Sequence, residues 1–222
     1  ELRNMDGFHQ NSPYHIYDVF EHTLHAMDYA PRNETVRLAL LFHDAGKPHS
    51  YSEDQNGVGH FYGHPALSEP ICRSVMSRLR FENRIIEDVA HLVKYHDITF
   101  NCDRAYIKRC LNKHGPDRLR MLVLVRASDI YAQSTYNQSE RMTKVRLFSE
   151  IFQSVYDSSE CFSLRDLAIN GNDLIQIGFC PGPKMGEILS TLLENVIDGN
   201  LQNKRESLLQ FARCHLTFSE DA

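Results

Sequence analysis

Residues 38–48 read Leu38-Ala39-Leu40-Leu41-Phe42-His43-Asp44-Ala45-Gly46-Lys47-Pro48. A helix that is apolar on most of its faces has to be buried, and a glycine and a proline then end it. The sequence therefore predicts a buried helix whose last turn carries His43 and Asp44 side by side, with Lys47 just beyond. Burying an imidazole and a carboxylate without partners is costly, and a divalent cation is a common partner. The simpler alternative is an ordinary helix end with a solvated aspartate.

The composition fits one globular domain with a small addition. The chain has 222 residues, of which 24% are charged and 42% hydrophobic, and its formal net charge is -5. That charge argues against a strongly basic nucleic-acid-binding protein but leaves room for a local basic patch. Six cysteines without a CxxC pair favour reduced thiols, and no apolar run approaches the ~20 residues that cross a bilayer. We expect a cytoplasmic protein without a membrane partner, and its oligomeric state stays open.

Histidine is the unusual residue of this chain, with 12 copies, roughly twice what average usage gives. Four residues of metal-ligand type follow at steps of three, four and three within a helix expected over 15–30: His15, Asp18, His22 and His25. This spacing puts them on one side of a helix, beside its apolar stripe. They form either a solvated face or one wall of a metal site.

Three further candidates come from other segments. In the helix expected over 85–96, His96 falls on the apolar face, whereas His91 points away from it. Asp129 follows a second strongly apolar run by one helical turn, and His64 ends a polar loop expected over 48–63. Buried helices and a long loop thus each present one ligand-type side chain.

The rest of the chain also has helical periodicity. Further helices are expected over 31–44, 66–80, 104–114 and 138–156, and one more runs from Pro116 through Asp129. In the C-terminal part, a short helix stops at Gly178, the next begins at Pro181-Gly182-Pro183, and the last begins near Lys204. No segment alternates with the period of two that a half-buried strand requires. The prediction is an all-α protein with a main domain over 1–157 and a small C-terminal helical extension over 158–222.

Six residues make up one candidate set: His22, His43, Asp44, His64, His96 and Asp129. For any single histidine, a place in the core or on the surface is the simpler interpretation. For all six together, a metal site explains more. Nitrogen and oxygen ligands without thiolate suit Fe, Mn, Ni, Co, Zn or Mg rather than a structural cysteine–zinc site. We expect one or two divalent metal ions.

The order of these residues resembles the HD superfamily of metal-dependent phosphohydrolases. His22, His43-Asp44 and Asp129 follow its H…HD…D pattern, and His64 and His96 extend the pattern to that of members with two metals. Nearly the whole chain is also similar to the C-terminal, HD-containing part of bacterial tRNA nucleotidyltransferases (CCA-adding enzymes and poly(A) polymerases). The segments that carry this likeness are Gln10–His15, Asp18-Val19, His22–Leu24, His43–Pro48, His60–His64, Asn170–Leu174, Pro181–Pro183, Met185–Glu187 and Gly199 with Asn203.

This resemblance implies an HD-domain helical bundle and a hydrolase that cleaves phosphate esters of nucleotides, cyclic nucleotides or RNA ends. The first ion would be held by His22, His43, Asp44 and Asp129, while His64 and His96 would complete a second site or bind phosphate. Asp44 would bridge the two ions, which lie ~3.5–4 Å apart in such sites. Lys47 would neutralise charge on the phosphoryl oxygens, or simply complement a helix dipole. His25 and His60 are weaker candidates for substrate contact or proton transfer.

The chain departs from the nucleotidyltransferases in one respect. Their nucleotidyl transfer depends on a head with a Gly-Gly-Ser/Thr turn and an Asp-x-Asp pair, and neither motif occurs here. We therefore do not expect this chain alone to add nucleotides. The competing hypothesis is a non-catalytic tRNA-binding module, with tRNA as partner. Its phosphate contacts would come from Arg73, Arg78, Arg80, Arg84, Arg104, Lys108, Arg109, Lys113, Arg118 and Arg120, which are otherwise solvated helix faces.

Overall fold

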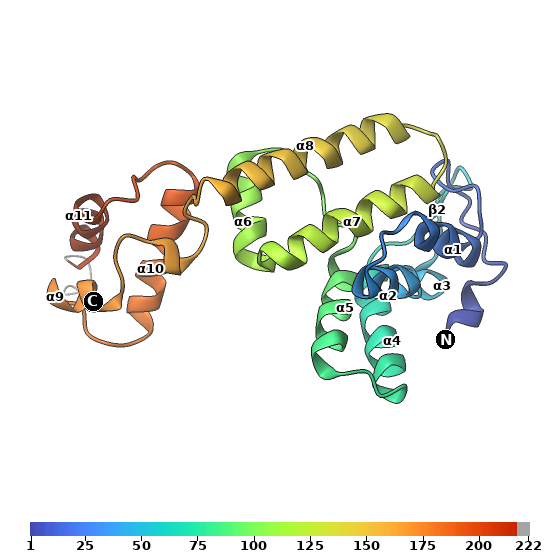
Figure 1. The fold of residues 1–222 in the computed structure, drawn as a ribbon, viewed down its shortest axis with the longest axis horizontal. Coiled ribbons are helices and arrows are strands. Elements are labelled where there is room, and N and C mark those ends of the chain that lie inside the picture. The colour runs from blue at the N-terminus through green and yellow to red at the C-terminus, as the bar shows by residue number, and fades with distance from the viewer. Residues whose placement is uncertain (217–222) are drawn as a thin grey trace. The chain divides into compact units, whose positions relative to one another are not determined.

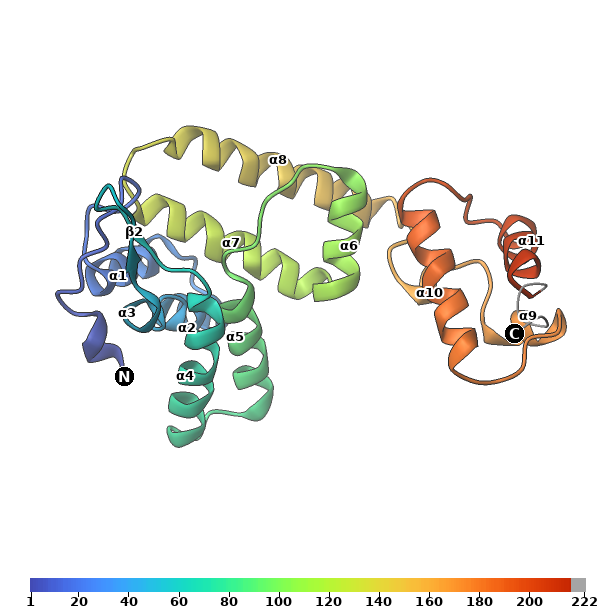
Figure 2. The ribbon, with the colours of Figure 1, turned by 180° about the vertical axis from the view of Figure 1, so that it is seen from behind.

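The computed structural model describes residues 1–216, and in this range the chain is almost entirely helical (Figures 1 and 2). The α-helices are α1 (Val19–Tyr29), α2 (Glu34–Phe42), α3 (Lys47–Ser50), α4 (His64–Arg78), α5 (Asn83–Tyr95), α6 (Arg104–His114), α7 (Pro116–Ala132), α8 (Gln138–Asp157), α9 (Gly171–Gln176), α10 (Pro183–Ile197) and α11 (Arg205–Leu216). Two 3₁₀ turns, η1 (Leu2–Met5) and η2 (Leu164–Asp166), and two short antiparallel strands, β1 (Ser52–Glu53) and β2 (Gly59–His60), complete the described elements. The all-α prediction is confirmed. No helix of residues 1–216 has the length and hydropathy needed to cross a membrane.

The chain forms two compact units, each with its own hydrophobic core. The first comprises residues 1–100 and 116–149, and the second comprises residues 101–115 and the chain from Glu150 onward. By packing, α6 therefore belongs with the C-terminal helices although it precedes α7 in sequence. The expected division into 1–157 and 158–222 rests on the sequence pattern rather than on packing and stays a prediction.

Helix α2 is central to the first unit because it contacts α1, α4, α5 and α7. Its residues Val36, Ala39, Leu40 and Phe42 are buried. These four neighbouring helices explain why the second half of α2, residues 38–42, is entirely apolar. Each fully buried aliphatic side chain stabilises such a core by roughly 1.5–3 kcal/mol relative to exposure. This packing holds the C-terminal end of α2 in the interior.

The second unit packs around α10, which contacts α6, α9, α11 and η2. Its core includes Leu174, Leu192, Leu193 and Leu208, all of which are buried. Arg109 of α6 also forms ion pairs with Glu194 of α10 and with Asp198 directly after that helix. The C-terminal helices thus have a core of their own, to which α6 is attached by packing and by charge.

The predicted helix over 15–30 starts too early. The side chain of Asp18 accepts a hydrogen bond of 2.8 Å from the backbone N–H of Glu21 and caps the helix, so that α1 begins at Val19. His15 therefore precedes the helix, and the predicted stripe of four ligand-type residues is not one helical face.

Two further boundaries are also wrong. Helix α2 begins at Glu34 rather than at Pro31, because the side chain of Asn33 caps it by accepting a 3.0 Å hydrogen bond from Val36 N. The segment expected as a loop over 48–63 contains most of α3 and the β1–β2 pair. Local capping and pairing, which hydrophobic periodicity does not register, decide all of these boundaries.

Candidate metal centre

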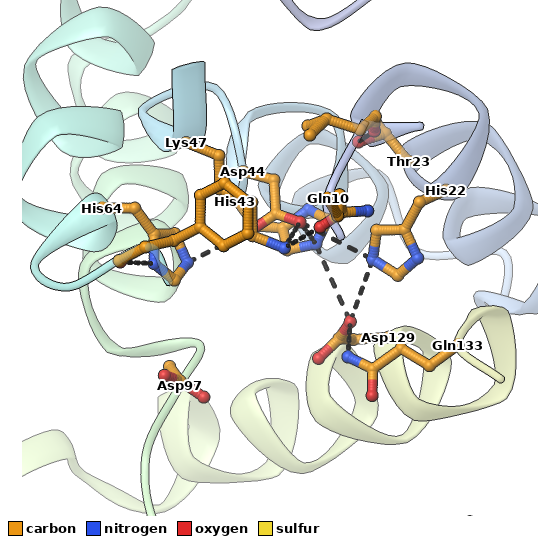
Figure 3. Close-up of polar contacts among 12 residues, drawn as sticks. Gln10, His22, Thr23, His43, Asp44, Lys47, His64, Asp97, Asp129 and Gln133 are labelled. Carbon is orange, nitrogen blue, oxygen red and sulfur yellow. Dashed lines mark hydrogen bonds and ion pairs between the residues drawn. The ribbon is translucent and has the colours of Figure 1, made fainter. Parts of the chain in front are cut away.

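The six ligand-type residues predicted from the sequence come together inside the first unit. Figure 3 labels five of them: His22, His43, Asp44, His64 and Asp129. Five helices supply them. They are His22 on α1, His43 and Asp44 at the C-terminal end of α2, His64 at the first position of α4, His96 directly after α5, and Asp129 on α7. All six are between 1% and 8% exposed, so the cluster is shielded from bulk water.

Asp44 lies in the middle of this cluster. Its Oδ2 is 3.2 Å from Nε2 of His43 and 3.6 Å from Nε2 of His22. Its Oδ1 is 3.2 Å from Nε2 of His64 and 3.8 Å from Nε2 of His96. Each carboxylate oxygen therefore faces two imidazole nitrogens, which is the arrangement that a carboxylate bridging two cations requires.

Asp129 completes the side of the cluster that faces His22. Its Oδ1 is 3.1 Å from Nε2 of His22 and 3.9 Å from Nε2 of His43. The same carboxylate accepts hydrogen bonds from Arg126 at 2.9 Å and from Gln133 at 2.8 Å. Arg126 lies on α7 and Gln133 directly follows it, so this helix and the residue after it both present the carboxylate and fix its orientation.

Backbone carbonyls fix which nitrogen of each histidine faces the centre. The Nδ1–H groups donate to carbonyl oxygens: His43 to Leu40 at 2.6 Å, His96 to Val93 at 2.7 Å, His64 to Phe61 at 2.8 Å, and His22 more weakly to Ala132 at 3.4 Å. A carbonyl only accepts, so in the neutral rings Nε2 carries the lone pair. Metal-binding histidines in proteins are commonly held in this way.

The cluster is poorly satisfied by its own protein groups. Among the described residues, Nε2 of His22 and Nε2 of His43 are buried without an assigned hydrogen bond, and their near neighbours are carboxylate oxygens. The Nε2 atoms of His64 and His96 are 3.0 Å apart, so two lone pairs face each other unless a proton or a cation lies between them. Two groups have ligand atoms within 4.8 Å of one another: His22 with His43 and Asp44, and Asp44 with His64 and His96. The donor set therefore fits one or two divalent cations.

The charges of the cluster also suit a cation. Burial opposes the ionisation of Asp44, but the charges of His43 and Lys47 outweigh it and hold the pKa well below its usual range. The pKa of Asp129 is likewise well below normal, because hydrogen bonding by His22 and the charge of Arg126 outweigh burial. Burial lowers the pKa of His96 to about 3, so that ring is neutral and has a free lone pair at physiological pH.

Lys47 lies deeper than the sequence indicated. It opens α3, and its Nζ is 2.7 Å from Oδ2 of Asp44 and donates a 2.7 Å hydrogen bond to Oε1 of Gln10. It is 5% exposed. It starts a short helix of its own directly after the end of α2, and the alternative of a lysine that complements the C-terminal dipole of α2 stays a prediction. Its charge acts on Asp44 directly.

A pocket of about 490 Å³ gives access to the cluster. Asp44, Lys47, His64, His96 and Asp129 form part of its wall. The remaining wall includes Tyr14, His15, His60, Phe61, Tyr62, Asp97, Arg126, Gln133 and Arg141. A small phosphate ester can therefore reach the buried ligands.

Comparison with known proteins then identifies the family. Residues 65–212, well over half of the chain, match the family model of tRNA nucleotidyltransferase domain 2. The chain belongs to this family. The family match begins just after His64, so it does not depend on His22, His43, Asp44 or His64.

Curated relatives of this tRNA nucleotidyltransferase domain extend the similarity toward the N-terminus. The chain is 29% identical over 215 residues to the CC-adding tRNA nucleotidyltransferase of Thermus thermophilus, a match that covers 93% of this chain and 47% of the relative. It is 25% identical over 219 residues to the A-adding tRNA nucleotidyltransferase of Deinococcus radiodurans, covering 93% and 49%. A 60-residue stretch, 27% of this chain and 15% of the relative, is 42% identical to a CCA-adding enzyme of Limosilactobacillus fermentum. The chain spans about half the length of the first two relatives.

The two weaker sequence candidates occupy different places in this family member. His60 is in the pocket wall, where Nε2 lies 3.2 Å from a carboxylate oxygen of Asp54 and the ring stacks on Tyr62. His25 stacks on Tyr17 and is not part of that wall. The structure therefore brings His60, but not His25, to the candidate centre.

Sequence reasoning missed several residues around the ligands. Gln10 holds Lys47, Arg126 and Gln133 hold Asp129, and Arg141 lines the pocket. Arg126 and Gln133 lie three residues before and four residues after Asp129, which is the spacing of neighbours on one helix face and could have identified them. Gln10 has no such local signal, because its contact with Lys47 joins segments that are distant in the sequence.

Proposed function

We propose that this chain is a metal-dependent phosphohydrolase of the HD type that cleaves phosphate esters of nucleotides, cyclic nucleotides or RNA ends. The observation that carries the proposal is Asp44, whose two oxygens each face two imidazole Nε2 atoms and which forms part of the wall of a pocket. A buried carboxylate surrounded by imidazole nitrogens is a ligand set, and its access to a pocket supports turnover rather than a purely structural site.

In this proposal the six residues divide into two groups that share Asp44. His22, His43, Asp44 and Asp129 hold the first divalent ion, and His64 and His96 complete a second site or bind phosphate. When bound, such an ion polarises the phosphoryl group and lowers the pKa of a water molecule toward neutrality. The oxygen and nitrogen donors suit Fe, Mn, Ni, Co, Zn or Mg.

The other residues of the site position these ligands and the substrate. Lys47 compensates the charge of Asp44 and is itself held by Gln10. Because it also lines the pocket, its ammonium is available to a phosphoryl oxygen. Arg126 and Gln133 fix the carboxylate of Asp129. His60, at the pocket wall, is the remaining candidate for substrate contact or proton transfer.

The test is metal content per chain in protein purified without chelator, together with hydrolysis of bis(p-nitrophenyl) phosphate and of a 2′,3′-cyclic nucleotide. Mn²⁺, Ni²⁺, Fe²⁺ and Mg²⁺ are supplied in turn. We expect one or two equivalents of metal and hydrolysis that a chelator abolishes. Asp44→Asn should lose both, whereas His49→Ala, a change at an exposed histidine outside the pocket wall, should keep both. Protein that holds no metal and hydrolyses neither substrate would refute the proposal.

Family membership supports a second candidate, a non-catalytic tRNA-binding module. The matched relatives are named for adding nucleotides to tRNA. The basic surface predicted for this role is weaker in the structure, because most of its members form ion pairs with carboxylates that would repel phosphate. These members are Arg73, Arg78, Arg104, Lys108, Arg109, Arg118 and Arg120. The buried, pocket-connected ligand set therefore makes the phosphohydrolase the better-supported function.

A further inference from the structure

Arg141, near the start of α8, lines the pocket without a carboxylate partner among the described residues. Its guanidinium donates hydrogen bonds to neutral oxygens only. They are the side-chain oxygen of Gln133, the carbonyl of Tyr136 at 2.9 Å and, at 3.4 Å, the carbonyls of Ser134 and Asn137. The guanidinium also lies 5.1 Å from the centre of the Tyr14 ring. These contacts hold the group in place without pairing it directly with a carboxylate, although the charge of Asp129 acts on it from beyond Gln133.

Arginines of the chain that pair with carboxylates differ from Arg141 in the direction of their pKa shift. Carboxylate partners raise the pKa values of Arg73, Arg78, Arg104 and Arg109. Partial burial and the charge of Arg126 instead lower that of Arg141. A guanidinium stays protonated in both situations, so Arg141 brings a fixed positive charge to the pocket wall.

The position of this charge relates it to the candidate metal centre. The amide of Gln133 donates a 2.8 Å hydrogen bond to Oδ1 of Asp129 and accepts one from Arg141. A single side-chain amide therefore separates the guanidinium from a candidate ligand. A substrate whose reacting phosphate lies at the centre would have Arg141 close to a neighbouring anionic group, and the planar fork of arginine matches phosphate oxygens.

An aromatic pair in the same pocket wall indicates a nucleoside between the anionic groups. The rings of His60 and Tyr62 are parallel to within 7°, with centroids 5.3 Å apart. Tyr62 is 77% exposed, so one face of its ring is free for a ligand. Exposed aromatic faces beside cationic groups are the usual means by which proteins hold unpaired bases.

We propose that Arg141 forms a second anion subsite and that the pocket takes a nucleotide with a second phosphate group. This group is either the other phosphate of a nucleoside bisphosphate or the adjacent phosphodiester of a strand. The inference rests on the proposed function, because it assigns the reacting phosphate to the histidine and aspartate centre.

The test is calorimetric titration of the full chain in EDTA, where hydrolysis cannot interfere, with adenosine 3′,5′-bisphosphate and with each adenosine monophosphate. Two or more charge-assisted hydrogen bonds correspond to roughly 10- to 100-fold in affinity. We expect the unaltered chain to bind the bisphosphate at least about 10-fold more tightly than either monophosphate. Arg141→Gln should bring the three affinities to within about twofold, and Arg141→Lys should keep part of the preference.

Arg146→Gln is the matched control, since it removes an exposed arginine from the same helix outside this pocket wall. It should leave the preference for the bisphosphate unchanged. A 5′-phosphorylated dinucleotide distinguishes the two sources: tighter binding than the bisphosphate assigns the subsite to a strand, and weaker binding assigns it to free nucleotides.

Two results would overturn the inference. One is equal affinity of the unaltered chain for mono- and bisphosphate. The other is an equal loss for all ligands in Arg141→Gln, which would mean that Arg141 only supports Asp129 through Gln133. Because binding is measured without metal and without turnover, a failure of the proposed hydrolase activity would leave either result interpretable.

Discussion

Asp44 has two buried histidine rings against each of its carboxylate oxygens, and its environment explains most of the chemistry of the site. A buried carboxylate normally favours its neutral form, yet here the nearby positive charges keep it ionised. The ammonium group of Lys47 offsets the negative charge at Oδ2 of Asp44, and imidazole rings face both carboxylate oxygens. The anionic form is therefore held ready for cations rather than neutralised by a proton.

Gly46 is the residue that allows this arrangement, because it lies against the first turn of α4. A Cβ atom at this position would be 2.5 Å from the carbonyl oxygen of His64 and 2.8 Å from the backbone nitrogen of Ser68. The backbone N–H of Gly46 also donates a 2.8 Å hydrogen bond to the hydroxyl of Ser68. Only glycine permits the chain after Asp44 to approach α4 so closely.

We therefore expect Gly46→Ala to destabilise the fold by about 1–3 kcal/mol, since backbone atoms must shift to relieve the contact. Because His64 moves with the start of α4, metal content should fall as well. Chemical denaturation and metal analysis measure the two effects. Gly186→Ala is the control: an added Cβ there meets nothing within 4 Å, and alanine favours the helix, so stability should stay equal or rise by up to about 1 kcal/mol. Equal effects at the two glycines would contradict this account of Gly46.

At the scale of elements, the ends of helices rather than their middles make the site. The last carbonyls of a helix have no partner within the helix. His43 follows α2 and His96 follows α5, and each ring donates its Nδ1–H to the carbonyl three residues earlier. One interaction thus satisfies a free carbonyl, fixes the tautomer and aims Nε2 at Asp44. Because the ligands lie at helix ends, the apolar side chains in the middle of each helix can pack in the core without interruption.

In the second unit, charge attaches α6 to the segment after α8. Glu160 pairs with Arg104 and with Lys108, the latter at 2.8 Å, and these contacts lower its pKa to about 2. The folded state therefore holds the Glu160 proton less tightly than the unfolded chain, whose value is about 4.5. This stabilisation is fully present above pH 4.5 and is lost as the pH falls toward 2.

Glu160→Gln should accordingly reduce the free energy of unfolding by about 1 kcal/mol at pH 7, after allowance for solvent screening of a partly exposed group. The difference in the free energy of unfolding between Glu160→Gln and the unaltered chain should shrink between pH 4.5 and pH 2, because Glu160 of the unaltered chain then becomes protonated and loses its negative charge. Urea denaturation across this pH range measures it. The exposed pair of Glu140 and Lys144 provides the control, and Glu140→Gln should change stability little. A Glu160→Gln effect that did not depend on pH would rule out the electrostatic explanation.

At the scale of the whole molecule, two separately packed units share one chain, and the candidate centre lies entirely within the first. Five helices of that unit supply ligands, so a cation bound to them would add a further link among elements that already meet through the core and through ion pairs. An ion that binds only the folded state stabilises that state by mass action.

Mn²⁺ at about 100 times its dissociation constant should stabilise the folded chain by about 2.7 kcal/mol. For a protein of this size, that free energy raises Tm by about 5–10 °C. Calorimetry with and without the ion measures the shift. Asp44→Asn should abolish it and His49→Ala should retain it. A full shift in Asp44→Asn would mean that Mn²⁺ binds elsewhere.

The tRNA-binding candidate makes a different prediction for the whole molecule. If the chain contacts tRNA through phosphates, its affinity should fall steeply, by about 10-fold or more, between 50 and 200 mM salt. Asp44→Asn, whose change is buried in the first unit, should not alter that affinity. Filter binding at several salt concentrations measures both effects. A weak salt dependence would argue against a phosphate-contacting surface.

The sequence by itself determined the helical class and which residues are candidates. Helical periodicity marks α2 and α5 as buried, and His96 lies on the apolar face of its segment, where the structure also buries it. Asp129 follows its apolar run in the same way. These inferences succeed because helix geometry relates residues three or four positions apart, which a sequence displays directly.

How the candidates meet depends on the tertiary structure. The fold places histidines against both oxygens of Asp44, holds Lys47 with Gln10, gives Arg141 neutral hydrogen-bond acceptors and separates His25 from the pocket. Each of these facts depends on contacts between segments far apart in the chain. Side-chain caps such as those of Asp18 and Asn33 likewise overrode periodicity at helix starts. The local pattern fixes which face of a helix is buried, whereas packing among helices fixes which polar groups lie within reach of one another.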